Sequence, residues 1–249
     1  MTGLDELAAR ATKLGGALGA VIEDLRTGRR AEVGAQRAFT SASVIKLPIA
    51  MTVLAGELPL DRQVMVRAAA RAGGSGILRD LEVPALSVRD LLTLMITISD
   101  NTATNVLIDL VGIDAVNAWC AGHGLTGTVL ARRMFDAEAR ARGEENLTTA
   151  RDVATLLADL ARGRLLDPPA TDFALDVLAR QRVNDRLPRH LPDGLRLAHK
   201  TGELDGIRHD AGIVLDKGKP TIVVVALTEA INSAATACDL IAEVGRLAY

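Results

Sequence analysis

The stretch that decides the fold occupies residues 41–48 and reads Ser-Ala-Ser-Val-Ile-Lys-Leu-Pro. On a helix, the three-residue spacing of Ser43 and Lys46 places both side chains on one face, one turn apart. The residues that follow, up to about Ala55, are mostly apolar, so we expect a buried helix that carries two polar side chains. Burial can leave a lysine amine neutral and basic, and a serine hydroxyl becomes a nucleophile when a base takes its proton. Taken alone, the pair also fits a core helix with a capping serine and a solvated lysine.

Two further short motifs contain residue types that acyl transfer needs. Ser-Asp-Asn at 99–101 lies between two apolar helical segments, and Lys-Thr-Gly at 200–202 ends a predicted strand. Each motif alone also fits an ordinary helix junction or a strand edge followed by a turn. Together with Ser43 and Lys46, they make three short motifs that each contain a hydroxyl group beside a second polar side chain.

The hydrophobic periodicity predicts an α+β fold. Strands are expected near both ends of the chain, and they can pair into one antiparallel five-stranded sheet flanked by the terminal helices. The expected strands are 17–24, 30–33, 195–201, 211–215 and 221–227, with a hairpin turn at Asp216–Lys219. The expected helices are 4–13, 43–55, 87–98, 101–111, 113–122, 129–142, 149–162, 171–181 and 230–247.

The middle of the chain is predicted to be helical, with Ser87 and Thr149 as N-caps of two of its helices. We therefore expect a single domain over 1–249 with two lobes and the active site between them. The α/β lobe comprises 1–55 and 190–249, and the helical lobe comprises 56–189. The glycine-rich run at 71–78 is expected to be a flexible loop, because it lacks the strand and the Gly-Lys-Ser/Thr ending of a phosphate cradle.

Composition narrows the class of protein. The 249 residues carry a net charge of −2 and only 2% aromatic residues, so we expect neither nucleic acid nor an anionic membrane as a partner. Residues 1–14 read as an amphipathic helix without the apolar run of a signal peptide. Cys120 and Cys238 have no metal-like spacing and fit reduced thiols of a cytoplasmic protein. We expect a monomer that needs no cofactor and no metal.

The ordered set Ser-x-x-Lys, Ser-Asp-Asn and Lys-Thr-Gly resembles the signature of class A β-lactamases and penicillin-binding proteins. The three motifs occur in that family's order, and the resemblance extends from about Leu18 to the closing helix. It implies a β-lactamase/transpeptidase-like fold and a small-molecule substrate, either a β-lactam or another acyl donor.

The resemblance also implies roles for the motif residues. Ser43 would attack a carbonyl, and Lys46 would take or relay its proton. Ser99 would pass a proton to the leaving amine, with Lys200 tuning that hydroxyl and attracting a substrate carboxylate. Asn101 would hydrogen-bond both Lys46 and a substrate amide.

A second group of residues would bind the substrate. The backbone N–H groups of Ser43 and Glu203 would form the oxyanion hole, beside Thr201 and Gly202 of the same motif. Arg208, eight residues after the motif lysine, is a candidate for binding a substrate carboxylate, and it equally fits a surface charge at a sheet edge.

One part of the class A pattern is missing. The family's deacylation base is a glutamate in a Glu-x-x-Leu-Asn motif, and residues 129–149 do not contain this motif. Glu138 is the candidate base, with Asp136 close to it and Asn146 as the asparagine of a rebuilt loop. Both acidic residues also fit as solvated partners of nearby arginines.

The nominal function is therefore β-lactam hydrolysis through a Ser43 acyl-enzyme. Because the deacylation motif is missing, three other reactions stay open. They are slow deacylation as in a penicillin-binding protein, acyl transfer by a cytoplasmic transacylase, and hydrolysis of a different ester or amide. A non-catalytic binding protein of the same fold would not require Ser43, Lys46, Ser99 and Lys200 together.

Overall fold

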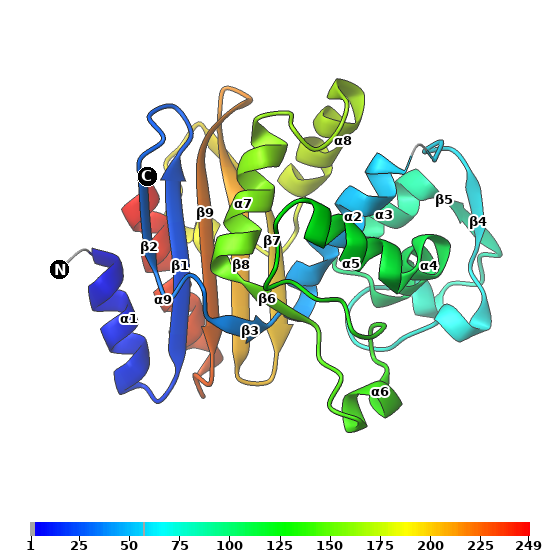
Figure 1. Cartoon of the computed structure of the whole chain (residues 1–249), viewed down its shortest axis with the longest axis horizontal. Coiled ribbons are helices and arrows are strands. Elements are labelled where there is room, and N and C mark those ends of the chain that lie inside the picture. Colours follow the sequence, from blue (N-terminus) through cyan, green and yellow to red (C-terminus); the bar gives the residue numbers. More distant parts are fainter. Residues whose placement is uncertain (1–2, 57) are drawn as a thin grey trace.

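The computed structural model describes residues 3–56 and 58–249. Its centre is a five-stranded antiparallel sheet in the order β2-β1-β9-β8-β7 (Figure 1). The predicted α+β fold is thereby confirmed. The strands are β1 (Ala17–Asp24), β2 (Arg30–Val33), β7 (Leu195–Leu204), β8 (Ile207–Asp216) and β9 (Lys219–Glu229).

The β8–β9 hairpin closes at the turn that the sequence predicts. Asp216 pairs with Lys219, and the two residues between them, Lys217 and Gly218, have φ angles of 48° and 81°. Two consecutive positive φ angles give the turn a twist that matches the two strands. The neighbouring strand β7 is longer than predicted, so the motif at 200–202 lies inside it rather than at its end.

Helices cover both faces of the sheet (Figure 1). α1 (Gly3–Lys13) and α9 (Ala234–Ala248) pack on one face, and α7 (Ala150–Ala161) packs on the other. Strand β9 shows why both faces are apolar, since its side chains alternate between two separate cores. Val223, Val225 and Leu227 belong to the core under α7, whereas Val224 and Ala226 belong to the core under the terminal helices.

A second group of helices packs around α2 (Lys46–Ala55), which follows the 3₁₀ turn η1 (Ala42–Ile45). Every residue of α2 from Lys46 to Val53 is buried, because α3, α4 and α5 surround it. The lobe boundaries at 55 and 190 stay a prediction. The surrounding helices are α3 (Val88–Thr97), α4 (Asn101–Val111) and α5 (Ile113–Gly122), with α8 (Pro168–Ala179) packed on α3.

Both predicted N-caps are confirmed. The Ser87 hydroxyl accepts from Asp90 N at the start of α3, and the Thr149 hydroxyl accepts from Asp152 N at the start of α7. α8 begins earlier than predicted because Asp167 caps it ahead of two prolines, and α9 begins later, behind its cap Ser233.

Several three-residue strands and short 3₁₀ turns were not predicted, because they are too short to show a period. The pairing of β3 with β6 ties the segment before Ser43 to a segment more than a hundred residues later. These elements are β3 (Ala38–Thr40), β6 (Leu147–Thr149), β4 (Gln63–Met65), β5 (Ala85–Ser87), η2 (Ala68–Ala70), η3 (Leu78–Asp80) and η4 (Leu187–His190).

The predicted helix over 129–142 is wrong. Only α6 (Ala137–Ala141) is helical there, and residues 129–136 form an extended loop. The backbone of that loop bonds to side-chain amides instead of to itself. The Asn146 amide bonds the backbone of Ala131 and Arg132, and the Asn105 amide bonds both backbone groups of Met134.

No helix within residues 3–56 and 58–249 is both long and apolar enough to span a lipid bilayer.

Candidate active site

A cavity of about 450 Å³ lies where the end of β7 meets the start of α2 and the loop before α6. Ser43 of the first motif, Asn101 of the second and Glu203, which directly follows the third, all line it. Also in the lining are Thr40, Ala42, Gly74, Ser75, Arg132, Met134, Phe135, Asp136, Ala137, Arg140, Glu145, Asn146 and Leu204.

Ser43 sits on the 3₁₀ turn η1, half-buried, directly before α2. Ala42, the residue before it, has a φ of 45°, a conformation that costs a non-glycine residue on the order of 1–2 kcal/mol. Strand β7 passes close to this turn. A Cβ on Gly202 would lie 3.2 Å from both the Ala42 Cβ and the Val44 Cγ2, so the strand and the turn are closely packed there.

Lys46 is the first residue of α2 and is fully buried. Its Nζ lies 2.7 Å from Ser99 O, 3.0 Å from Ser99 Oγ and 2.8 Å from Asn101 Oδ1. Burial lowers the pKa of Lys46 well below its usual value, and the nearby Lys200 lowers it further. A neutral amine can donate to Ser99 O and Asn101 Oδ1 and keeps a lone pair that can accept a proton.

Ser99 occupies the junction between α3 and α4 with a φ of 59°. This left-handed backbone lets the carbonyl and the hydroxyl of one residue both reach Lys46. Asn101 Nδ2 donates to Gly73 O (2.8 Å), so its side chain links Lys46 to the glycine-rich run.

That run forms a wall of the cavity. Asp100 Oδ2 accepts from Ile77 N (2.7 Å) and Leu78 N (2.8 Å), and Asn101 N donates to Ser75 O (3.0 Å). Gly76 has a φ of 101°, and a Cβ there would collide with Asp100. The sequence suggested only a flexible loop at 71–78, so its part in the cavity was missed.

Lys200 is fully buried on β7. Its Nζ donates to Thr201 O at 2.8 Å. Burial lowers the pKa of Lys200 to about 7; Asp210 opposes this shift and Arg186 adds to it. The lysine of the third motif therefore changes charge near neutral pH.

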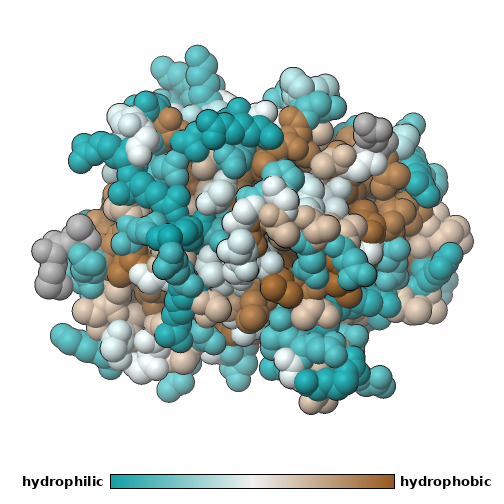
Figure 2. All heavy atoms as spheres, in the orientation of Figure 1, coloured by the Kyte–Doolittle hydropathy of each residue, from teal (hydrophilic) through white to brown (hydrophobic). Residues whose placement is uncertain are grey.

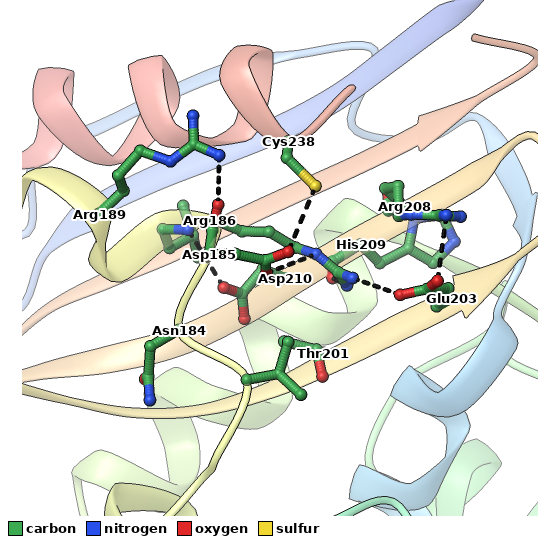
Figure 3. A network of polar contacts seen from close by, with 12 residues as sticks. Asn184, Asp185, Arg186, Arg189, Thr201, Glu203, Arg208, His209, Asp210 and Cys238 are labelled. Carbon is green, nitrogen blue, oxygen red and sulfur yellow. Dashed lines mark hydrogen bonds and ion pairs between the residues drawn. The ribbon is translucent and has the colours of Figure 1, made fainter. Parts of the chain in front are cut away.

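An ion-pair network adjoins this strand (Figure 3). Glu203 bonds to Arg208 and to Arg186, an arginine that no sequence motif pointed to. Arg186 is only 1% exposed and contacts carbonyls of β7 and β8. Its role depends on contacts between distant segments, which a single sequence does not display.

His209 and Asp210 also belong to β8 but do not line the cavity. His209 Nε2 donates to Thr40 O (2.8 Å), and burial lowers the pKa of this histidine to about 4. It therefore stays neutral and ties β8 to the segment just before η1. Asp210 Oδ1 lies 2.8 Å from Nδ1 of His199, a residue of β7.

The structure does not bring Glu138 to the site. Its side chain is exposed on α6 and does not line the cavity. The surface around α6, at the lower right of Figure 1, is mostly hydrophilic in Figure 2. The carboxylates that do line the cavity are those of Asp136, Glu145 and Glu203.

Each of these carboxylates already has a partner. Asp136 caps α6 by accepting from Ala139 N (2.9 Å), and Glu145 lies 3.1 Å from Arg132 Nη2 and 3.4 Å from Arg140 Nε. Asn146, predicted to belong to a rebuilt loop, lines the cavity and holds the loop backbone through its amide.

A family model described as the beta-lactamase enzyme family matches residues 4–249. This chain belongs to that family. As a beta-lactamase family member, it is a serine hydrolase of the β-lactamase type, and the predicted resemblance is confirmed.

Relatives of this chain include proteins named as β-lactamases. A β-lactamase of Streptomyces fradiae is 31% identical over 244 residues, which cover 92% of this chain and 79% of the relative. The extended-spectrum β-lactamase PER-1 of Pseudomonas aeruginosa is 27% identical over 236 residues, covering 85% of this chain and 74% of the relative.

Solved structures of the family superpose closely on this chain. The crystal structure of a β-lactamase from Sphaerobacter thermophilus has a TM-score of 0.90 at 35% identity, covering 99% of this chain and 95% of the other. The structure of PBP-A has a TM-score of 0.88 at 30% identity, covering 99% and 95%.

Proposed function

We propose that this chain hydrolyses the amide of a β-lactam through an acyl-enzyme on Ser43. The observation that carries the proposal is the arrangement around Lys46. A fully buried amine contacts Ser99 and Asn101, one helical turn after a serine that lines the cavity. Burial favours the neutral form of such an amine, and a neutral amine can act as a base.

In the acylation step, Ser43 Oγ would attack the β-lactam carbonyl as the neutral Lys46 amine takes the hydroxyl proton. The new bond joins Oγ to the carbonyl carbon, and the bond that breaks joins that carbon to the ring nitrogen. The nitrogen needs a proton, and the Ser99 hydroxyl, 3.0 Å from Lys46 Nζ, would supply it. Lys46 would then return a proton to Ser99, so that the proton lost by Ser43 ends on the leaving nitrogen.

The carbonyl oxygen becomes negative in this step. The N–H groups of Ser43 and Glu203 would stabilise it, since η1 and β7 lie against each other at Gly202. One such donor typically contributes about 3 kcal/mol to lowering the barrier. Lys200 and Thr201, on the same strand, would bind a carboxylate of the substrate.

In the second step, water would release the acyl group. None of the carboxylates that line the cavity belongs to a Glu-x-x-Leu-Asn motif, and each is engaged by at least one hydrogen bond or ion pair. We therefore infer that deacylation is slower than acylation. A monomeric state and a cytoplasmic location stay predictions of the sequence.

The test uses a chromogenic cephalosporin and a fluorescent penicillin. Turnover is followed by absorbance, and the covalent mass of the protein is followed by mass spectrometry. We expect an adduct on Ser43 and slow but steady turnover, both lost in Ser43→Ala. A stable adduct without turnover would favour a penicillin-binding protein or an acyltransferase, and the absence of any adduct would contradict the proposal.

A further inference from the structure

Glu203 lies between two guanidinium groups at the rim of the cavity. Its Oε2 is 2.6 Å from Arg186 Nη2, and its Oε1 is 3.0 Å from Arg208 Nη2 (Figure 3). Each oxygen of the Glu203 carboxylate thus forms an ion pair with one arginine. Charge-assisted hydrogen bonds of this kind are the stronger ones in proteins.

The arginines are fixed without Glu203. Arg186 Nη1 donates to Gly202 O and His209 O, both at 3.0 Å, and its Nε lies 3.2 Å from Asp185 Oδ1. Arg208 Nη1 donates to the carbonyls of residues 204 and 207, at 2.7 and 2.8 Å. The backbone therefore anchors both cations whether or not the carboxylate is present.

Exposure separates the three side chains. Arg186 is 1% and Arg208 16% exposed, whereas the Glu203 side chain is 57% exposed. The Glu203 carboxylate is the most accessible group of the three to an incoming ligand. A rotation of the Glu203 side chain would break its contacts with the two arginines while the arginines stayed in place.

The same strand carries the residues proposed to bind a substrate carboxylate. Thr201 and Lys200 precede Glu203 by two and three residues on β7. An anionic group arriving there meets the Glu203 carboxylate, which lines the cavity and occupies Nη2 of both arginines. Lys200 and Arg186 are both buried, so Arg208 is the most accessible of the three cations near such a group.

We propose that Glu203 is an internal counter-anion that sets substrate specificity. Its carboxylate occupies the donors of Arg186 and Arg208 that an anionic acyl donor would otherwise use. Glu203 thereby weakens the binding of donors that carry a carboxylate next to the scissile amide, relative to neutral donors. This inference rests on the proposed acyl-enzyme on Ser43.

The test compares Glu203→Gln with wild type on benzylpenicillin and its methyl ester, which share the scissile amide but differ in charge. Glutamine keeps the shape and the backbone N–H and removes the charge. We expect the acylation efficiency for benzylpenicillin, relative to the ester, to rise about tenfold, because one charge-assisted contact becomes available to the substrate. Glu203→Ala should shift the ratio in the same direction, and an unchanged or lower ratio in both variants would overturn the inference.

Glu145→Gln is the matched control. It removes another carboxylate that lines the cavity and is paired with Arg132 and Arg140, away from β7. We expect its ratio to stay at the wild-type value. An equal rise in this variant would assign the effect to net charge and would also overturn the inference.

A failure of the proposed function is recognised separately. If neither compound acylates wild-type Ser43, that function is contradicted, and the inference is then tested by binding alone. Calorimetry with Ser43→Ala, with and without Glu203→Gln, measures the affinity for benzylpenicillin and for its ester. A tenfold gain confined to benzylpenicillin supports the role of Glu203, and equal affinities overturn it.

Discussion

Lys46 Nζ lies 3.0 Å from Ser99 Oγ, and the lysine has no access to solvent. The amine connects a helix that follows the nucleophile to a junction 53 residues later in the chain. With its pKa lowered by burial, it can pass a proton between two hydroxyl groups. This contact joins the first two sequence motifs into one proton path.

The first prediction concerns this path. Lys46→Arg should reduce the acylation rate at least a hundredfold, because a guanidinium does not lose its proton in proteins and general base catalysis contributes roughly 10²–10⁴-fold. Ser99→Ala should slow acylation in the same range. Stopped-flow absorbance with a chromogenic cephalosporin measures both rates.

The control for the lysine is Lys217→Arg in the exposed β8–β9 turn. It should acylate at the wild-type rate. If Lys46→Arg acylated at the wild-type rate, the Lys46 amine would be excluded as the base.

The second prediction concerns pH. Lys200 has a pKa of about 7, so it is positively charged below that pH and neutral above it. Since kcat/KM reports the free enzyme, its value for benzylpenicillin should fall as the pH rises through about 7. The methyl ester has no carboxylate to attract and should show no such fall. Identical profiles for the two compounds would show that the charge on Lys200 does not serve binding.

The third prediction separates the deacylation candidates. Because Glu138 is exposed and outside the cavity, Glu138→Gln should leave the lifetime of the acyl-enzyme unchanged. The lifetime is measured by mass spectrometry after excess penicillin is removed. A longer lifetime in this variant would restore Glu138 as the base despite its position. Asp136→Asn, which lines the cavity and keeps the cap of α6, is the comparison variant.

The site elements that could be predicted from sequence are those with local patterns. The turn before α2, the junction at Ser99 and strand β7 each combine a short motif with a clear hydrophobic period, and their residues do meet at one cavity. Segment 129–136 could not be predicted in this way. Its backbone is held by Asn105, 29 residues from its partner Met134, and by Asn146, so no local period marks its shape.

Arg186 illustrates the same limit on the other side of the cavity. It follows no motif, and its partners are the carbonyls of Gly202 and His209 on two strands that come later in the chain. Only the pairing of β7 with β8 creates its binding position.

The last prediction concerns Gly202. Its φ is not in the left-handed region, so an alanine there would be opposed by close packing and not by backbone conformation. An added Cβ would lie 3.2 Å from the Ala42 and His209 Cβ atoms and from the Val44 Cγ2, so these neighbours would have to shift by a few tenths of an ångström. We expect Gly202→Ala to lower the free energy of unfolding by about 1–3 kcal/mol, as overpacking does, and to reduce the acylation rate because the proposed oxyanion hole widens.

Urea unfolding and acylation kinetics measure the two effects. Gly122→Ala, at the end of α5 with no atom within 4 Å of the new Cβ, should be neutral or stabilising by up to about 1 kcal/mol. If Gly202→Ala matched that control in both stability and acylation rate, the close approach of β7 to the turn of Ser43 would not be what shapes the oxyanion hole.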